Sequence, residues 1–585
     1  MKRVILLAGC VAAACLCLTT CKIPGSSSPS SPAASIPTVF LTDYNGDFSY
    51  SLDVGSDKHD VYFVFSNKSV DTSATSASVK NAVGSIKVNG ATIAESSSQP
   101  AGGPSTSSTK AKDFLARSNR DIISAMSSGG IKVSGSSTAK IASPSAATEG
   151  STGGFYDLDS LDYWSSVPST CRLVRTASTN QGSRTLNIWV ANDCYDTGST
   201  KKHAVTSGMV TALADAFLNA SGNQKDIYDW DTEMLGPEWG APQGAYASEL
   251  IPYDGSITIL LSDIEQDNSD TGGTVGYFWA GNNFQTAYES GSNARIMFVV
   301  DAVMFANASA TKSGSSSSGW SISSSYWAKY CLSTLAHEFQ HMIQFYRKGV
   351  LVRGDCQSAD TWINEMCSQL VEDLVSKNFN DELGISVNGP RGVAPSDGTA
   401  GSAGNTDGRL PYFNAFLDYD DRQLTKTSDY DAYDYSFSYA FGAWLARNFG
   451  GAQFVRNVVY DSNTDSTCIT DAVRAYSGRS LSMGDLISRW AVAVLASDRS
   501  DMPVGYRYNT GDWVSSSVNG TSYSLGSIDF FNYSPVPQIY TGSGSTPSIA
   551  ASSNVYYKAL GSDSGSHSWS LSLPQGVSFG VYVTP

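Results

Sequence analysis

Charged residues are scarce in this 585-residue chain: they make up 16% of it, well below the roughly one quarter that is usual in globular proteins. Acidic residues outnumber basic ones by 54 to 38, so the formal net charge is −16. Without a basic surplus the chain has no field to hold phosphate backbones, which argues against nucleic acid as a partner. Hydrophobic residues still reach 41%, a content that argues against wholesale disorder.

The Cys-x-x-Cys motif is also lacking among the ten Cys. This absence argues against a thiolate zinc site and against a redox motif. Six Cys follow the first 21 residues, and an even count in an exported chain permits disulfides, with Cys171–Cys194 the pair easiest to imagine. The six are Cys171, Cys194, Cys331, Cys356, Cys367 and Cys468.

The amino-terminal apolar run is short. After Met1-Lys2-Arg3 it extends from residue 4 to residue 18, too little to span a bilayer of about 30 Å but suitable for a signal peptide. Thr19-Thr20-Cys21 follows the run, and the whole resembles a bacterial lipoprotein signal, although Thr20 departs from the Gly, Ala or Ser usual before the Cys. We therefore expect residues 1–20 to be a signal peptide and acylated Cys21 to anchor an exported protein in the lipid bilayer, on the outer surface or in the periplasm of a bacterium. The alternative is an ordinary secreted protein.

Composition and pattern divide the rest of the chain into five parts. Residues 21–36, rich in Ser and Pro, predict a flexible tether. Apolar and polar residues alternate with a period of two in residues 37–92, which predicts an N-terminal β-domain. Residues 93–153 are Ser-rich, and the sequence does not decide between a linker and a pro-segment. Strand-like runs followed by helical patterns over 154–500 predict one large α+β domain, and residues 501–585 predict a C-terminal β-rich module.

Histidine and glutamate are both scarce, with five His and eleven Glu in the chain. Nevertheless His337-Glu338-x-x-His341 occurs inside a helical pattern, a match expected by chance about once in a thousand such chains. Positions i and i+4 lie about 40° apart around a helix, so both imidazoles project from one face and can bind one Zn²⁺. Glu338 can reach a water at such a metal without being a ligand.

A catalytic zinc needs a third protein ligand. The helical pattern over 358–377 carries Glu365, which lies 24 residues beyond His341, enough for a turn and a second helix facing the first. Cys367 points about 200° away from Glu365 and is rejected as a ligand. A solvated Glu365 remains the alternative.

At these residues the chain resembles the hyicolysin family of neutral zinc metallopeptidases, which are thermolysin-like gluzincins. The resemblance covers about residues 180–450 and is strongest at 334–374. It implies a thermolysin-like zinc peptidase domain, here with small β-rich domains on either side. It also implies that His337, His341 and Glu365 bind zinc and that Glu338 is the catalytic base.

The chain departs from the thermolysin-like pattern at one residue that would support a metal ligand. Thermolysin-like enzymes carry an Asp four residues after the ligand Glu, where this chain has Gln369. An amide brings no charge to a zinc-bound His, so Glu372 is the candidate for that role.

Two further candidates rest on weaker patterns. Tyr439, in Tyr-x-x-Gly, resembles the oxyanion donor of aminopeptidase-like gluzincins; a structural Tyr439 is the alternative, and Tyr435 is a second candidate. Asp263, Asp267 and Asp270 could hold Ca²⁺, although a solvated acidic loop fits their spacing better.

Together these observations predict a zinc endopeptidase acting on extracellular proteins, with protein or peptide substrates. An endopeptidase is favoured because no acidic motif for a substrate's free amino group is recognisable. The alternative is a non-catalytic surface lipoprotein, an adhesin that binds host or matrix proteins through its β-modules. Intact His337, Glu338, His341 and Glu365 argue against it, because a scaffold has no need of Glu338.

Overall fold

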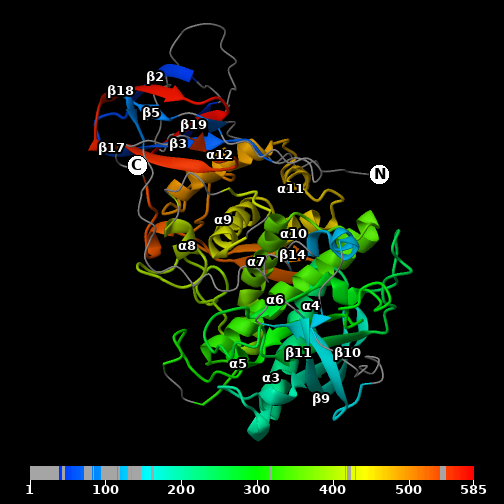
Figure 1. Cartoon of the computed structure of the whole chain (residues 1–585). Coiled ribbons are helices and arrows are strands. Elements are labelled where there is room, and N and C mark those ends of the chain that lie inside the picture. The colour runs from blue at the N-terminus through cyan, green and yellow to red at the C-terminus, as the bar shows by residue number, and fades with distance from the viewer. Residues whose placement is uncertain are drawn as a thin grey trace, which may run out of the picture.

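The computed structural model confirms the predicted α+β class. In Figure 1 a β-sandwich lies at the top, a mixed sheet at the bottom, and helices lie between them. The predicted signal peptide, the tether with Cys21 and most of the 93–153 segment lie outside the residues that the structure describes. These are 39–42, 46–70, 82–83, 85–93, 115, 119–128, 133–134, 147–159, 164–315, 319–415, 417, 423–427, 430–539 and 548–584.

The β-sandwich is built from both ends of the chain, as the mixture of blue and red arrows in Figure 1 shows. One sheet has the order β1-β19-β3-β17 and the other the order β2-β18-β5-β6, while β16 pairs with β4. The strands are β1 (Val39–Thr42), β2 (Gly46–Asp53), β3 (His59–Asn67), β4 (Ala82–Val83), β5 (Lys87–Val88), β6 (Ala91–Thr92), β16 (Ser548–Ile549), β17 (Asn554–Asp563), β18 (Ser566–Leu573) and β19 (Val577–Val583).

This arrangement corrects the prediction of separate modules at 37–92 and 501–585. β3 lies between β17 and β19 and pairs with both, so the N-terminal strands have their partners at the other end of the chain. The core is aromatic: the ring of Phe579 lies 5.0 Å from that of Phe63 and 5.3 Å from that of Tyr50. A period of two identifies strands but carries no information on distant partners.

The first part of the predicted C-terminal module belongs to the helical region instead. Its hairpin, β14 (Val514–Val518) and β15 (Thr521–Leu525), packs on α7 (Thr361–Asn378). Tyr523 in β15 donates to the backbone carbonyl of Trp230 at 2.6 Å. The sandwich joins this region through α12 (Met483–Leu495), which packs on β3, β17 and β19.

The mixed sheet positions one side of the functional site. Its order is β12-β13-β11-β10-β9-β7, and β8 pairs with β9. β10, β11 and β13 run parallel to one another, while the short strand β12 lies antiparallel at the edge. The strands are β7 (Val133–Ser134), β8 (Thr152–Leu158), β9 (Trp164–Thr179), β10 (Gly182–Ala191), β11 (Ser256–Ser262), β12 (Gly276–Tyr277) and β13 (Met297–Asp301).

A buried carboxylate fixes this edge strand. Asp157 on β8 accepts hydrogen bonds from Tyr277 of β12 and from Ser262 of β11, each at 2.6 Å. Burial raises the pKa of Asp157 to about 6. The edge strand is therefore tied to the sheet by a side-chain bridge as well as by its short ladder with β13.

Two helices carry the site through the core. α6 (Tyr326–Gln344) and α7 pack against each other and are buried over most of their circumference, so both behave as core helices rather than surface ones. The other helices are α2 (Ile122–Ser127), α3 (Ser207–Phe217), α4 (Ile227–Leu235), α5 (Ala302–Phe305), α8 (Leu410–Ala415), α9 (Ala432–Asn448), α10 (Ala452–Tyr460) and α11 (Thr467–Ser477).

Two sequence-based questions concern cysteines and membranes. All six cysteines beyond Cys21 are buried free thiols, so the suggested Cys171–Cys194 disulfide is absent from the described residues.

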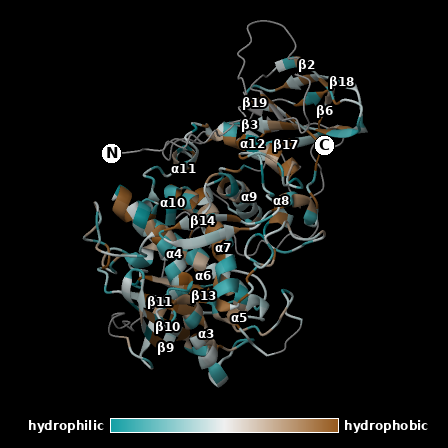
Figure 2. Cartoon of the chain, turned by 180° about the vertical axis from the view of Figure 1, so that it is seen from behind, coloured by the Kyte–Doolittle hydropathy of each residue, from teal (hydrophilic) through white to brown (hydrophobic). Residues whose placement is uncertain are grey.

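Over that same part of the chain, no helix combines the length and apolarity needed to cross a bilayer. Figure 2 shows hydrophobic and hydrophilic residues interleaved along the helices.

We predict that Phe579→Ala, a change in the last strand, loosens the first strands of the chain. Emptying the centre of the aromatic core should cost about 3–5 kcal/mol. Hydrogen exchange should then rise in β2 and β3, measured by mass spectrometry on peptides covering 46–53 and 59–67. Unchanged protection of these peptides would instead support two independent β-modules.

Candidate active site

Three buried side chains from α6 and α7 converge on one point. His337 and His341 project from α6 one turn apart, with ring centroids 4.7 Å from each other. Glu365 on α7 faces them: its carboxylate oxygens lie 3.1 Å from Nε2 of His337 and 3.7 Å from Nε2 of His341. These three residues, only 5–8% exposed, form the one group in the described residues with ligand atoms close enough to share a metal ion. We call them the ligand cluster.

The ligand cluster fits zinc. Atoms bound to one metal at 2.0–2.1 Å in a tetrahedron lie about 3.3 Å apart, between the two distances observed. Two imidazoles and one carboxylate also match the three-ligand pattern that leaves a fourth position open in catalytic zinc sites. Cys367 belongs to the buried free thiols and is not part of the cluster.

Outer partners fix the orientation of both imidazoles. Nδ1 of His337 lies 2.7 Å from Oε1 of Glu372, whose other oxygen accepts a 2.5 Å hydrogen bond from Ser333. Nδ1 of His341 lies 3.0 Å from Oδ1 of Asn364. An acceptor at each Nδ1 holds the proton there and directs the Nε2 lone pair to the metal position.

The structure thus places Glu372 in the supporting role considered for it. Gln369 lies elsewhere: its amide donates to the backbone carbonyl of Glu365 at 3.1 Å and to Ser438 at 3.3 Å. Asn364, which contacts Nδ1 of His341, was not singled out from the sequence. The available signal was that Asn364 directly precedes the ligand Glu365.

Electrostatics couple the ligands to one another. Burial acts to lower the pKa of His337, but its hydrogen bonds with Glu365 and Glu372 outweigh this effect and raise the pKa to about 10. Burial acts to raise the pKa of Glu365, but the imidazoles of His341 and His337 hold it below its usual range. A metal bound at this cluster would compete with protons for the same imidazole and carboxylate atoms.

Glu338 lies next to the cluster without belonging to it. Its Oε2 accepts a 2.8 Å hydrogen bond from the backbone N–H of Phe278, directly after the edge strand β12. Burial raises the pKa of Glu338, although His337 and His341 act to lower it. The carboxylate is thus held at a fixed place beside the metal position, where a proton acceptor is needed.

Tyr439 does not reach the site, which corrects its assignment as oxyanion donor. It is fully buried, and its hydroxyl donates to Asp373 at 2.9 Å. Tyr435, one turn earlier on α9, lines both cavities that meet at the ligand cluster. Burial and the nearby charge of Glu365 raise its pKa well above the ordinary value, so the phenol keeps the proton that it could donate.

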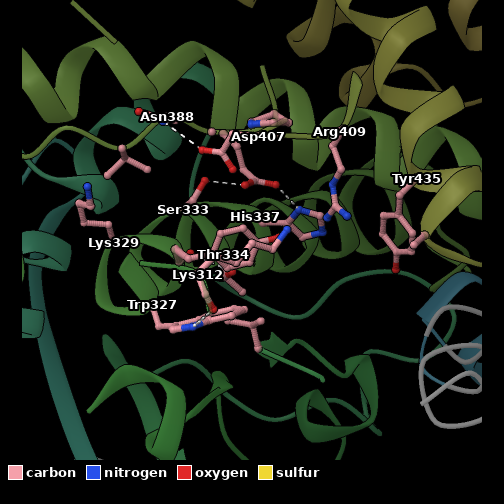
Figure 3. Close-up of a pocket in the computed structure, with 18 of the residues that line it drawn as sticks. Lys312, Trp327, Lys329, Ser333, Thr334, His337, Asn388, Asp407, Arg409 and Tyr435 are labelled. Carbon is pink, nitrogen blue, oxygen red and sulfur yellow. Dashed lines mark hydrogen bonds and ion pairs between the residues drawn. The ribbon is translucent and has the colours of Figure 1, made fainter. Parts of the chain in front are cut away.

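The two cavities differ greatly in size. The larger, about 570 Å³, extends from His337 and Glu338 along α6 and is shown in Figure 3. Arg409 lies in its wall beside His337, with its guanidinium 5.3 Å from the centre of the Tyr435 ring. This arginine was missed from sequence because no local motif marks it.

The smaller cavity, about 70 Å³, lies on the His341 side of the cluster and is bounded by Leu115 and Asn119. The Asn119 side chain donates to the carbonyl of Phe278 and accepts from the N–H of Ala280, both at 2.7 Å. The described part of the predicted 93–153 segment therefore contacts the edge of the site. The choice between linker and pro-segment stays a prediction.

The suggested calcium loop already contains cationic partners. Lys201 contacts Asp263 at 2.7 Å, and Lys202 contacts Asp270 at 3.1 Å. Asp270 also lies 3.3 Å from Nε2 of His203. Asp267 is exposed, as a solvated acidic loop predicts, but Asp263 is buried and only 4% exposed, so that interpretation does not hold for it. Calcium binding stays a prediction.

We predict that Glu372→Gln lowers zinc affinity by about 10- to 100-fold, because a neutral amide cannot polarise His337 as a carboxylate does. Competition against a chromogenic chelator measures the affinity. Glu382→Gln, the same change at an exposed position beyond α7, is the matched control. Equal zinc affinity in the two variants would contradict a supporting role for Glu372.

The chain matches one protein family over most of its length. Residues 166–584, more than two-thirds of the chain, match the model of the peptidase M30 family. Two crystal structures of a mutant two-domain M1 zinc metallopeptidase, bound to L-tryptophan and to L-arginine, match at 14% and 13% identity with TM-scores of 0.27 and 0.28. Each match covers 56% of this chain and 54% of the M1 chain. No curated protein matches the chain.

The family match spans the ligand cluster, Glu338 and every residue that lines the larger cavity. The donor set of the cluster is the one that such an enzyme requires. The chain therefore belongs to the peptidase M30 family, the hyicolysin-type zinc metallopeptidases.

Proposed function

We propose that the chain is an exported zinc endopeptidase of extracellular proteins in which Glu338 is the general base. The observation that carries the proposal is the place of Glu338: buried beside the ligand cluster, outside it, and in the wall of both cavities. Zinc held by His337, His341 and Glu365 would supply a Lewis acid that polarises the scissile carbonyl and lowers the pKa of a water.

The chain's own residues carry the remaining steps. Glu338 takes a proton from the attacking water and later passes it to the leaving amine, a role that suits a carboxylate with a raised pKa. The hydrogen bond from Phe278 leaves one oxygen of Glu338 for this transfer. Tyr435 donates its phenolic hydrogen bond to the carbonyl oxygen as negative charge develops there.

We predict that Glu338→Gln lowers kcat for casein hydrolysis by about 10²–10⁴-fold, since it removes the proton acceptor. About one zinc per chain should remain bound, because the ligand cluster is unchanged. Zinc is quantified by atomic absorption in both proteins. Turnover equal to the parent would exclude Glu338 as the base.

Substitution of Tyr435 and of Tyr439 in α9 should have different effects on kcat in the same assay. Tyr435→Phe should lower kcat by about 10²-fold, as loss of an oxyanion donor does. Tyr439→Phe should instead leave kcat near the parent value and cost about 1 kcal/mol of stability in urea unfolding, because it removes a buried hydrogen bond to Asp373. The opposite pattern would return the oxyanion role to Tyr439.

The export route is a separate part of the proposal. It is supported by the short apolar run and by Cys21 at its end. Cys21→Ala should abolish incorporation of an alkyne fatty acid in a bacterial host and release the protein from the membrane fraction. Cys10→Ala is the control, because Leu7-Ala8-Gly9 before Cys10 also resembles a lipoprotein signal. Labelling that survives Cys21→Ala would contradict anchoring at this residue.

A further inference from the structure

The larger cavity follows α6 away from the ligand cluster toward the start of the helix. Its wall contains His337 and then, one and two turns earlier, Ser333 and Lys329. Trp327 lies at the far end, and its indole N–H donates to the backbone carbonyl of Lys312 at 3.2 Å. In Figure 3 Lys329, Ser333 and His337 follow one another across the view, and Trp327 lies below them beside Lys312.

Three cationic side chains line this cavity: Lys312, Lys329 and Arg409. Lys312 is exposed, while Lys329 and Arg409 are half-buried. Within the described part of the chain, no carboxylate forms an ion pair with Lys312 or Lys329, whereas the charges of Glu372 and Glu365 act on Arg409. This is unexpected in a protein with a net charge of −16, where acidic partners outnumber basic ones.

The acidic groups in the same wall are held by other contacts. Glu372 is bound by His337 and Ser333, and Glu338 by the backbone of Phe278. Asp407 accepts from Asn388 at 3.1 Å and from Tyr326 at 3.4 Å. Asp431 accepts from backbone N–H groups at the start of α9.

The spacing along α6 sets the distance from the metal position. Eight residues separate Lys329 from His337, which is about 12 Å along a helix. An extended peptide advances about 3.3 Å per residue, so this distance corresponds to about three or four residues. Since a lysine side chain reaches several ångströms, its ammonium group would meet a substrate about two to four residues from the scissile bond.

We propose that this cavity is a subsite for a carboxylate of the peptide substrate, placed two to four residues from the scissile bond and bound by Lys329 and Lys312. The carboxylate comes either from an Asp or Glu side chain or from the substrate's own C-terminus. Trp327 and Tyr330 supply an aromatic wall for the aliphatic part of such a residue. The inference rests on the proposed peptidase function and names its substrate class.

The test uses quenched fluorescent peptides in which a single Glu or a single Gln is moved through four positions on each side of the cleaved bond. A second pair differs only in a free or an amidated C-terminus, which separates the two sources of the carboxylate. Each peptide is measured as kcat/KM with the zinc-loaded parent and as Kd, by fluorescence anisotropy, with the zinc-loaded Glu338→Gln variant.

The variants are Lys329→Glu and Lys312→Glu, with Lys87→Glu as a charge-matched control in the distant β-sandwich, where Lys87 is exposed. The parent should favour a carboxylate at one or two positions by about fivefold over its neutral counterpart, the size of a partly shielded ion pair. Lys329→Glu should reverse this preference, while Lys87→Glu should leave it unchanged. The preference of the parent for the charged peptide should decrease as the salt concentration rises from about 0.05 to 0.5 M.

Equal values for charged and neutral peptides at every position, in both kcat/KM and Kd, would overturn the subsite. A preference that persists in both lysine variants would do the same. If no peptide is cleaved, the proposed endopeptidase function fails by itself, and the Kd ratios still decide whether the cavity binds a carboxylate.

Discussion

The site depends on one contact above all, the hydrogen bond between Nδ1 of His337 and Glu372. It spans the interface of α6 and α7, so it fixes the rotation of the imidazole and the distance between the two helices together. Asn364 acts in the same way on His341. Because both Nδ1 atoms are engaged, both Nε2 atoms face Glu365, and three ligands meet at one point. Without these outer partners the same three ligands would be free to turn apart.

The rest of the domain places the reacting groups around that point. The edge strand β12, tied down through Asp157, brings the N–H of Phe278 to Glu338. On the opposite side, Asp373 of α7 accepts hydrogen bonds from Tyr439 and Arg447 of α9, each at 2.9 Å. This buried pairing fixes α9 against α7. It also explains why Tyr435, one turn before Tyr439, lies at the cavity.

The ligand cluster could be predicted from the sequence because the spacing of residues along a helix determines which side chains share a face. His337 and His341 follow from the four-residue period and Glu338 from its place beside His337, while Glu365 was a candidate because 24 residues are enough for a second helix to return toward the first. The same period could not decide between Tyr435 and Tyr439, which share one side of a helix that is buried nearly all round. Arg409 comes from a loop and the start of α8, where no period applies. The shared β-sandwich was missed because β3 pairs with strands about five hundred residues away.

The central claim is that two imidazoles and one carboxylate bind catalytic zinc, and X-ray absorption at the zinc edge tests it most directly. The zinc-loaded chain should show only nitrogen and oxygen neighbours at about 2.0–2.1 Å, with scattering from two imidazole rings. His341→Ala should reduce this to one ring. A sulfur neighbour at about 2.3 Å, or an unchanged spectrum in His341→Ala, would contradict the account.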